Sequence, residues 1–109
     1  METHEIKQEV KVLSKKTLLK GTTKQIVVNK YWDSHGDEHD WGTDTTNYDS
    51  EKEFEIIEEQ VEHDFGFNKF TFEHWHIFVD GKRFDKEFEL TGYKHLKTKL
   101  VLHGCVGAG

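Results

Sequence analysis

The stretch that decides the fold is a run of aromatic and β-branched residues ending in a tight-turn signal, Phe70-Thr71-Phe72-Glu73-His74-Trp75-His76-Ile77-Phe78-Val79-Asp80-Gly81. Residues of these types favour extended chain, so a long strand is predicted over 70–79. Asp80-Gly81 is typical of a two-residue type I′ hairpin turn, in which both central residues take a positive φ. Lys82-Arg83-Phe84 is therefore expected to begin the returning strand.

A helix is predicted just upstream of this strand. Ser50 and Glu53 stand three residues apart, as in a capping box that satisfies the free amide groups of a first helical turn. Gly66 is a typical C-terminal stop. Between these signals the apolar residues recur at helical spacing, as Phe54, Ile57, Val61 and Phe65. Glutamates occupy the remaining positions, and we interpret them as a solvated outer face.

The other elements predicted are mostly strands. Alternating or β-branched runs indicate strands over 9–13, 25–32 and 97–102, with a hairpin in 14–23. The polar segment 33–49 is interpreted as a long loop with at most one short strand at 45–48, and 85–96 as irregular. This order predicts an α+β fold in which one helix packs on a mixed sheet. A single domain is expected over 1–102, followed by a flexible tail.

Composition indicates one soluble domain with an aromatic core. The chain has 109 residues, of which 34% are hydrophobic, and its eight Phe, three Tyr and three Trp supply large apolar surfaces. A net charge of −6 argues against nucleic acid or an anionic membrane as the main partner. The single cysteine permits no disulfide within the chain, and no secretory signal is visible, so a cytoplasmic protein is expected.

The last seven residues contain three glycines and almost nothing that could pack in a core: His103-Gly104-Cys105-Val106-Gly107-Ala108-Gly109. Because glycine lacks Cβ, such a tail could thread a narrow channel and present its carboxylate to another protein. Frayed chain ends are also often rich in small residues. The tail, 103–109, is thus interpreted as a candidate functional terminus beside the plainer reading of a loose end.

The C-terminal part of the chain resembles ubiquitin and its β-grasp relatives. The residues that carry the resemblance are Ile77-Phe78-Val79-Asp80-Gly81-Lys82-Arg83-Phe84, Leu90-Thr91-Gly92-Tyr93 and Lys99-Leu100-Val101-Leu102-His103-Gly104, with Gly109 at the end. They match an apolar strand, a Gly-Lys turn, an irregular stretch with a tyrosine and a Leu-Val-Leu strand, downstream of a helix. The chain departs from the family in ending with Gly107-Ala108-Gly109 rather than Gly-Gly, in carrying Cys105, and in its longer N-terminal half.

The resemblance implies a ubiquitin-like protein modifier that is a substrate and not an enzyme. Gly107, Ala108 and Gly109 would form the conjugation terminus, and the protein would hold no cofactor or metal itself. A partner activating enzyme would use ATP and Mg²⁺ to activate the Gly109 carboxylate, and a conjugating enzyme would transfer it to a target protein. Bacterial pathways of this kind, some implicated in antiphage defence, are one setting. The partner-binding surface implied by the match is His76, Phe78, Lys99 and Val101.

Three alternatives stay open beside the modifier. A sulfur carrier of the same fold would carry a thiocarboxylate at Gly109, and a non-covalent β-grasp binding module would leave the tail inert. A metal site is the third, because histidines and aspartates gather in the loop and on the long strand. These residues are Asp33, His35, Asp37, His39, Asp40, His74 and His76. Their spacing fits no known closed metal site, and Cys105 has no base assigned to it, so it is interpreted as a passive thiol.

Overall fold

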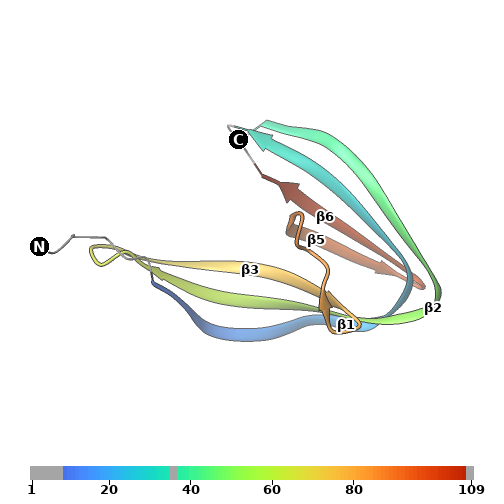
Figure 1. Cartoon of the computed structure of the whole chain (residues 1–109), viewed down its shortest axis with the longest axis horizontal. Helices are drawn as coiled ribbons and strands as arrows, with labels where there is room; N and C mark the ends of the chain where they lie inside the picture. The colour runs from blue at the N-terminus through green and yellow to red at the C-terminus, as the bar shows by residue number, and fades with distance from the viewer. Residues whose placement is uncertain (1–8, 35–36, 108–109) are drawn as a thin grey trace, which may run out of the picture.

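The computed structural model shows an all-β protein (Figure 1). It describes residues 9–34 and 37–107, with the backbone alone for 33, 34, 37 and 38. Six strands follow one another along the chain: β1 (Glu9–Ser34), β2 (Asp37–Asp64), β3 (Lys69–Val79), β4 (Lys82–Arg83), β5 (Glu89–Leu96) and β6 (Lys99–Val106). The expected α+β β-grasp fold is therefore wrong, since the segment predicted to be a helix lies inside β2.

The strands form one sheet that closes on itself. Their order is β2-β1-β6-β5-β3-β4, and a further pairing of β2 with β3 joins the two sides, so five strands make a closed ring. The β1–β6 pairing is parallel and the others are antiparallel. The closure between β3 and β5 is narrow, because Trp75 and Leu90 are the one residue pair that joins these strands.

The first two strands are much longer than the barrel needs, and they extend beyond it. Figure 1 shows β1 and β2 bending together, so that their two halves diverge like the sides of a V. Three register shifts along β1 lie in or beside its first half, and such bulges bend and twist a strand. One side of the V consists of β3 with the adjoining halves of β1 and β2. We call this three-stranded element the arm, comprising residues 9–23, 52–64 and 69–79.

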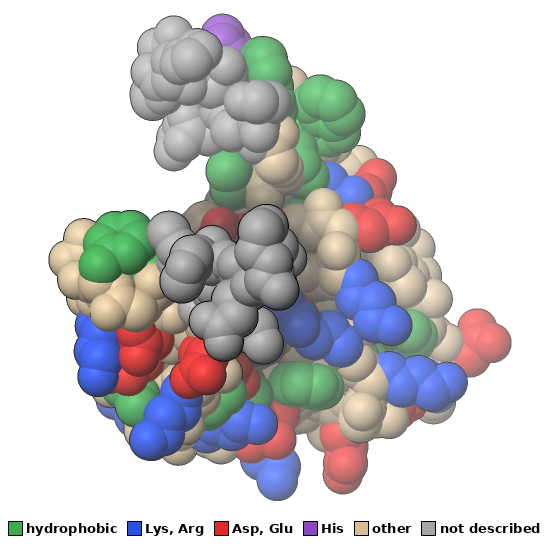
Figure 2. Space-filling model, turned by 60° about the vertical axis from the view of Figure 1, so that its left-hand side comes forward, with side chains coloured by type: hydrophobic (Ala, Val, Ile, Leu, Met, Phe, Trp, Pro, Cys, Tyr) green, Lys and Arg blue, Asp and Glu red, His purple; other side chains and the backbone are tan. Residues whose placement is uncertain are grey.

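The arm makes the molecule elongated. The radius of gyration is 16.8 Å and the extents are 59 × 30 × 22 Å. A compact chain of this length would have a radius of gyration of about 13 Å. Figure 2 shows lysine and acidic side chains interleaved over the visible face. Among the described residues no helix is long and apolar enough to span a membrane.

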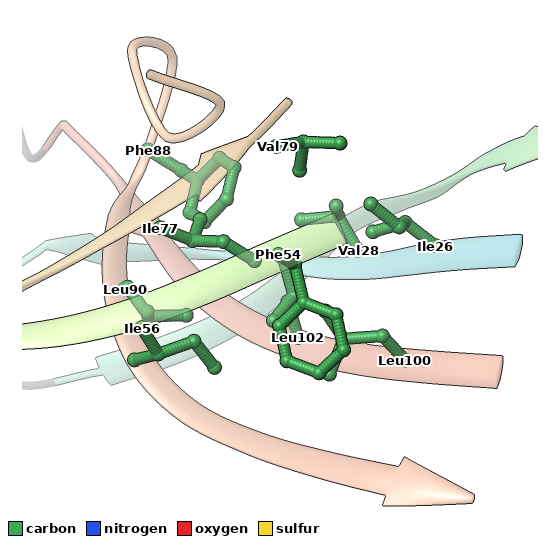
Figure 3. Packing of buried hydrophobic residues seen from close by; sticks show 10 residues of the cluster. All are labelled: Ile26, Val28, Phe54, Ile56, Ile77, Val79, Phe88, Leu90, Leu100 and Leu102. Atoms are coloured by element: carbon green, nitrogen blue, oxygen red, sulfur yellow. The ribbon is translucent and has the colours of Figure 1, made fainter. Parts of the chain in front are cut away.

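The hydrophobic core lies inside the barrel, where the strands converge (Figure 3). Apolar side chains at alternate positions of each strand point inward, as the two-residue period of a strand requires. The core residues are Ile26, Val28, Phe54, Ile56, Ile77, Val79, Phe88, Leu90, Leu100 and Leu102. Phe88 comes from the segment between β4 and β5, and it packs directly against Gly104 of β6. This loop residue therefore plugs the barrel.

The helix prediction failed because two periods overlap in 54–65. Phe54, Ile57 and Val61 recur at helical spacing, but that pattern leaves out Ile56, which is fully buried. In the strand, Phe54 and Ile56 face the core together, while Ile57 and Val61 lie on the opposite face. Gly66 is a turn residue with φ 88° rather than a helix stop. Sheet partners on both sides of β2 outweighed the local capping signal.

Three other expectations were wrong. The predicted hairpin in 14–23 is part of the continuous strand β1, and most of the predicted loop 33–49 belongs to the first half of β2. Residues 89–96 form β5, although 85–96 was expected to be irregular. The strand prediction for 70–79 is confirmed, and so is the hairpin turn, since Asp80 and Gly81 have φ values of 50° and 77°.

Candidate functional site

The outer face of the arm is apolar although it faces away from the core. Strand register places Val10, His63 and Phe70 side by side across the three strands, and Val12, Val61 and Phe72 in the next row. Val61 is only 4% exposed because it lies between the side chains of its two neighbours. The flanking residues are open, with Val10 58%, Phe70 45% and Phe72 46% exposed.

Phenylalanines in the β2–β3 turn extend this surface to the tip of the arm. The Phe65 ring lies 5.9 Å from that of Phe70 and 6.4 Å from that of Phe67, measured between centroids. Phe67 is 71% exposed. The turn is held by a hydrogen bond from Phe65 N to the Asn68 carbonyl, 2.9 Å long. We call the whole surface the aromatic face, defined as Val10, Val12, Val61, His63, Phe65, Phe67, Phe70 and Phe72.

The rings of the aromatic face are in contact with one another. Phe72 lies 6.2 Å from Phe70, and it meets His63 edge-on at 5.2 Å. The row continues through His74 to His76, whose imidazoles stack at 6.4 Å. Aromatic pairs at such distances favour these geometries, so the side chains are partly ordered before any partner arrives. A surface of this kind loses little side-chain entropy on binding.

Beyond the core residues Phe54, Ile56 and Ile77, the inner face of the same strands is polar towards the tip, which makes this part of the arm amphipathic. Gln60 links its two neighbours across the sheet, accepting a hydrogen bond from Ser14 and donating one to Glu73. In the rows on either side of Gln60, Lys11 lies opposite Glu62 and Lys16 lies opposite Glu58. A sheet whose outer face is the apolar one is unusual in a lone domain, because an apolar face is normally covered by a second layer.

A charged cleft of about 650 Å³ lies where β3 meets the segment that leads to β5. At its base is Asp85, whose side chain is 1% exposed. Arg83 donates to both carboxylate oxygens, at 2.8 and 3.1 Å, and the Ile77 amide donates at 3.2 Å. His76 Nδ1 lies 3.1 Å from Oδ2. Burial alone would raise the pKa of Asp85, but these hydrogen bonds outweigh it and hold the pKa below its usual value.

Both histidines of the cleft also lie near acidic partners within the chain. His74 Nδ1 lies 3.7 Å from Glu89, and His76 Nε2 lies 4.0 Å from Glu59. Cys105 lines the same cleft, and its thiol lies 3.9 Å from the Val106 carbonyl. The contacts of Asp85 and of the two histidines tie β3 to the segment before β5.

The residues predicted to form a partner surface lie on two separate strands. His76 and Phe78 are on β3, while Lys99 and Val101 are on β6, and β5 stands between these strands in the sheet. Phe78 pairs with Glu55 and Arg83, whereas Val101 pairs with Val27 and Lys94. They have no sheet neighbour in common. His76 adjoins the aromatic face through His74.

The predicted conjugation terminus is only partly described. Residues 103–106 belong to β6, where Val106 pairs with Trp32, so the expected tail is shorter than 103–109. Gly107 follows the strand, and Ala108 and Gly109 lie outside the described residues. The roles assigned to these three residues, and the activating and conjugating partners with their ATP and Mg²⁺, stay predictions. The β-grasp resemblance that implied them is not supported by this all-β barrel.

The described residues show no group of three or more His, Cys, Asp or Glu placed to hold a metal ion. Of the loop residues considered for a metal, His39 packs against the Trp32 ring at 5.9 Å, and Asp40 accepts a hydrogen bond from Gly42 N. The His35 position and the side chains of Asp33 and Asp37 lie outside the described part. Comparison with protein-family models, curated proteins and solved structures finds no match, so function is inferred from the site's own residues.

The aromatic face was missed from sequence, although a signal for it exists. Val10 and Val12 alternate with Glu9 and Lys11, and Phe70 and Phe72 alternate with Thr71 and Glu73. Each run reads as a half-buried strand. The sequence alone does not show that the apolar side chains of these two runs would point away from the barrel core.

Proposed function

We propose that this protein is a non-covalent protein-binding module whose contact surface is the aromatic face of the arm. The observation that carries the proposal is an exposed, contiguous apolar surface on the outside of a projecting sheet. Large exposed apolar patches are rare on soluble monomers and mark interaction sites. The exposed fractions of Phe67, Phe70 and Phe72 place three aromatic side chains in solvent on one surface.

The chemistry of the surface suits a protein partner. Aromatic side chains dominate the energetics of interfaces, because each buries a large area at low entropic cost. The charged pair Lys15–Glu59 borders the apolar rows at 3.9 Å and would form part of a polar rim. We propose no catalytic role, since the buried carboxylate of the cleft, Asp85, is held by Arg83 and the Ile77 amide. The single cysteine supports a cytoplasmic setting for the proposed binding.

The test is site-specific photo-crosslinking in cells, with a photoreactive residue at Phe67 or, as control, at Ser14 on the polar inner face. We expect one discrete protein adduct from position 67 and none from position 14. Phe70→Ser combined with Phe72→Ser should abolish the adduct, while deletion of 107–109 should leave it unchanged. An adduct that survives the double substitution would contradict the proposal. Loss of the adduct on deleting the last three residues would favour a function that uses the tail.

A further inference from the structure

Among residues 9–34 and 37–107, nothing pairs with the outer edge of β3 over its first half. Residues 69–79 pair with β2 on one side without any register shift. On the other side, within the described residues, pairing begins at Trp75 with Leu90. The free edge therefore runs over 69–74, from the β2–β3 turn to the barrel closure. Unpaired backbone groups in such an edge readily accept another strand.

The opposite edge of the arm is protected, which makes β3 the edge that pairs. The first half of β1 is interrupted by register shifts at Val12/Ser14 and Thr17/Leu19. Lysines also crowd this strand, at positions 11, 15, 16 and 20. Bulges and lysines are the devices by which proteins keep edge strands from pairing. β3 has no bulge in its ladder with β2 and no proline.

We propose that a second copy of this chain pairs with the β3 edge in an antiparallel, two-fold arrangement centred on Thr71. In this register Thr71 faces its own counterpart, Phe70 faces Phe72 of the other copy, and Lys69 faces Glu73 of the other copy. All three are pair types that stabilise antiparallel sheets. The sequence of the edge is thus complementary to itself in charge and in shape, as an isologous interface requires.

Neighbouring registers lack this complementarity. A shift by one residue brings the apolar face of one copy beside the polar face of the other, because side chains alternate along a strand. Centring on Phe72 sets Thr71 opposite Glu73 and leaves Lys69 opposite Trp75, whose edge is already paired with Leu90, so the pair between Lys69 and Glu73 is lost. The register centred on Thr71 is the one that pairs Lys69 with Glu73. It also places both aromatic faces on the same side of one six-stranded sheet.

The inference rests on the proposed function only in treating the arm as an interaction surface. Lys69 is 67% exposed and lies 3.9 Å from Asp64 of its own chain, an exposed contact that costs little to exchange for a pairing with Glu73. A ladder of five residues on each chain is a small interface, so the dimer should be weak and concentration-dependent.

The test is sedimentation equilibrium of the full chain over a wide concentration range, using charge reversal. Lys69→Glu and Glu73→Lys should each weaken dimerisation about tenfold or more, because each creates two like-charge pairs. An equimolar mixture of the two variants should form a heterodimer, and the double variant K69E/E73K should dimerise again. Lys94→Glu on β5 makes the same change in net charge away from the edge and should dimerise like the unaltered chain.

A chain that stays monomeric at every concentration would overturn the inference. So would a mixture of the two single variants that fails to associate, or a Lys94→Glu variant as weak as Lys69→Glu. Circular dichroism of each variant separates loss of pairing from loss of folding, and the double variant provides a folded comparison. Failure here is distinct from failure of the proposed function, because Lys69→Glu and Glu73→Lys leave Phe67, Phe70 and Phe72 unaltered. A charge variant that no longer dimerises should still give the position-67 adduct with another protein, and an adduct of twice the chain's own mass is assigned to the dimer instead.

Discussion

Replacing Gly104 by alanine should destabilise the barrel more than any other single-methyl addition at a described glycine in a strand interior. Gly104 lies in β6 directly under the Phe88 ring. An added Cβ would overlap Phe88 Cδ2, and it would lie 2.7 Å from Cγ and 3.0 Å from Cβ. Carbon atoms pack best at about 3.5–4.0 Å, so the ring must retreat by roughly 1 Å. Phe88 is 8% exposed and packed among core residues, so there is little room for that movement.

The expected cost of Gly104→Ala is about 1–3 kcal/mol in the free energy of unfolding, the usual range for overpacking a core. Each kcal/mol should lower the melting temperature by about 4–8 °C in a domain of this size. Urea unfolding followed by tryptophan fluorescence measures the free energy, and a thermal scan gives the melting temperature. Gly92→Ala is the matched control, because its Cβ would lie 3.5 Å from His103 in ordinary contact.

Phe88→Ala tests the cause. It removes the Cγ and Cδ2 atoms that the new methyl group would strike, so adding Gly104→Ala to Phe88→Ala should cost less than adding it to the unaltered chain. The reasoning is refuted if Gly104→Ala is as stable as Gly92→Ala. It is also refuted if the cost of Gly104→Ala is the same with and without the Phe88 ring, since the two substitutions would then not interact.

Three further outcomes are expected. Asp85→Asn should lose about 1–3 kcal/mol near neutral pH, because the buried donors around it lose a charged acceptor. Since the folded-state pKa of Asp85 is lowered, its contribution is present above about pH 4 and disappears as the pH falls through the folded pKa, so urea-unfolding curves of the two proteins should converge in acid; a constant difference would contradict this. Thr23 is fully buried, and its hydroxyl donates a hydrogen bond of 2.8 Å to the Thr98 carbonyl. Thr23→Val removes this hydrogen bond and should lower the free energy of unfolding by about 1–2 kcal/mol in the same assay, whereas Thr23→Ser keeps it and should cost less. Equal costs would assign the effect to packing. Phe67→Ser should change stability by less than about 0.5 kcal/mol while reducing binding of a fluorescent apolar dye, and unchanged dye fluorescence would argue against the aromatic face as exposed surface.

Local sequence signals predicted the structure of this chain correctly where they were compatible with only one type of secondary structure. A type I′ turn requires a positive φ at two successive residues. Asp-Gly is one of the few dipeptides that readily adopt this conformation, and Asp80 and Gly81 do so here. The aromatic run before it has only one favourable form, a strand. The segment 50–66 was different, because a capping signal and helical spacing coexisted with the alternation of Phe54 and Ile56. Two β partners then decided in favour of the strand.

The candidate site was less accessible to prediction than the strands. The partner surface expected at His76, Phe78, Lys99 and Val101 stays a prediction, and its residues lie on β3 and β6 with β5 between them. Sequence spacing says which residues of one strand share a face, and it does not say which strands are neighbours. The aromatic face needs β1, β2 and β3 in one register before its residues meet.

The sequence by itself determined the strand character of β3 and β6, the turn at Asp80-Gly81 and the period-two alternation at the start of β1 and of β3. These properties arise from backbone preference and from side-chain direction within a few residues. Tertiary structure alone decided that 51–64 would be a strand, that Phe88 would plug the barrel, and that the phenylalanines of the aromatic face would lie outside. Each of these depends on contacts between distant segments, whose free energy exceeds the small local preferences that a sequence reveals.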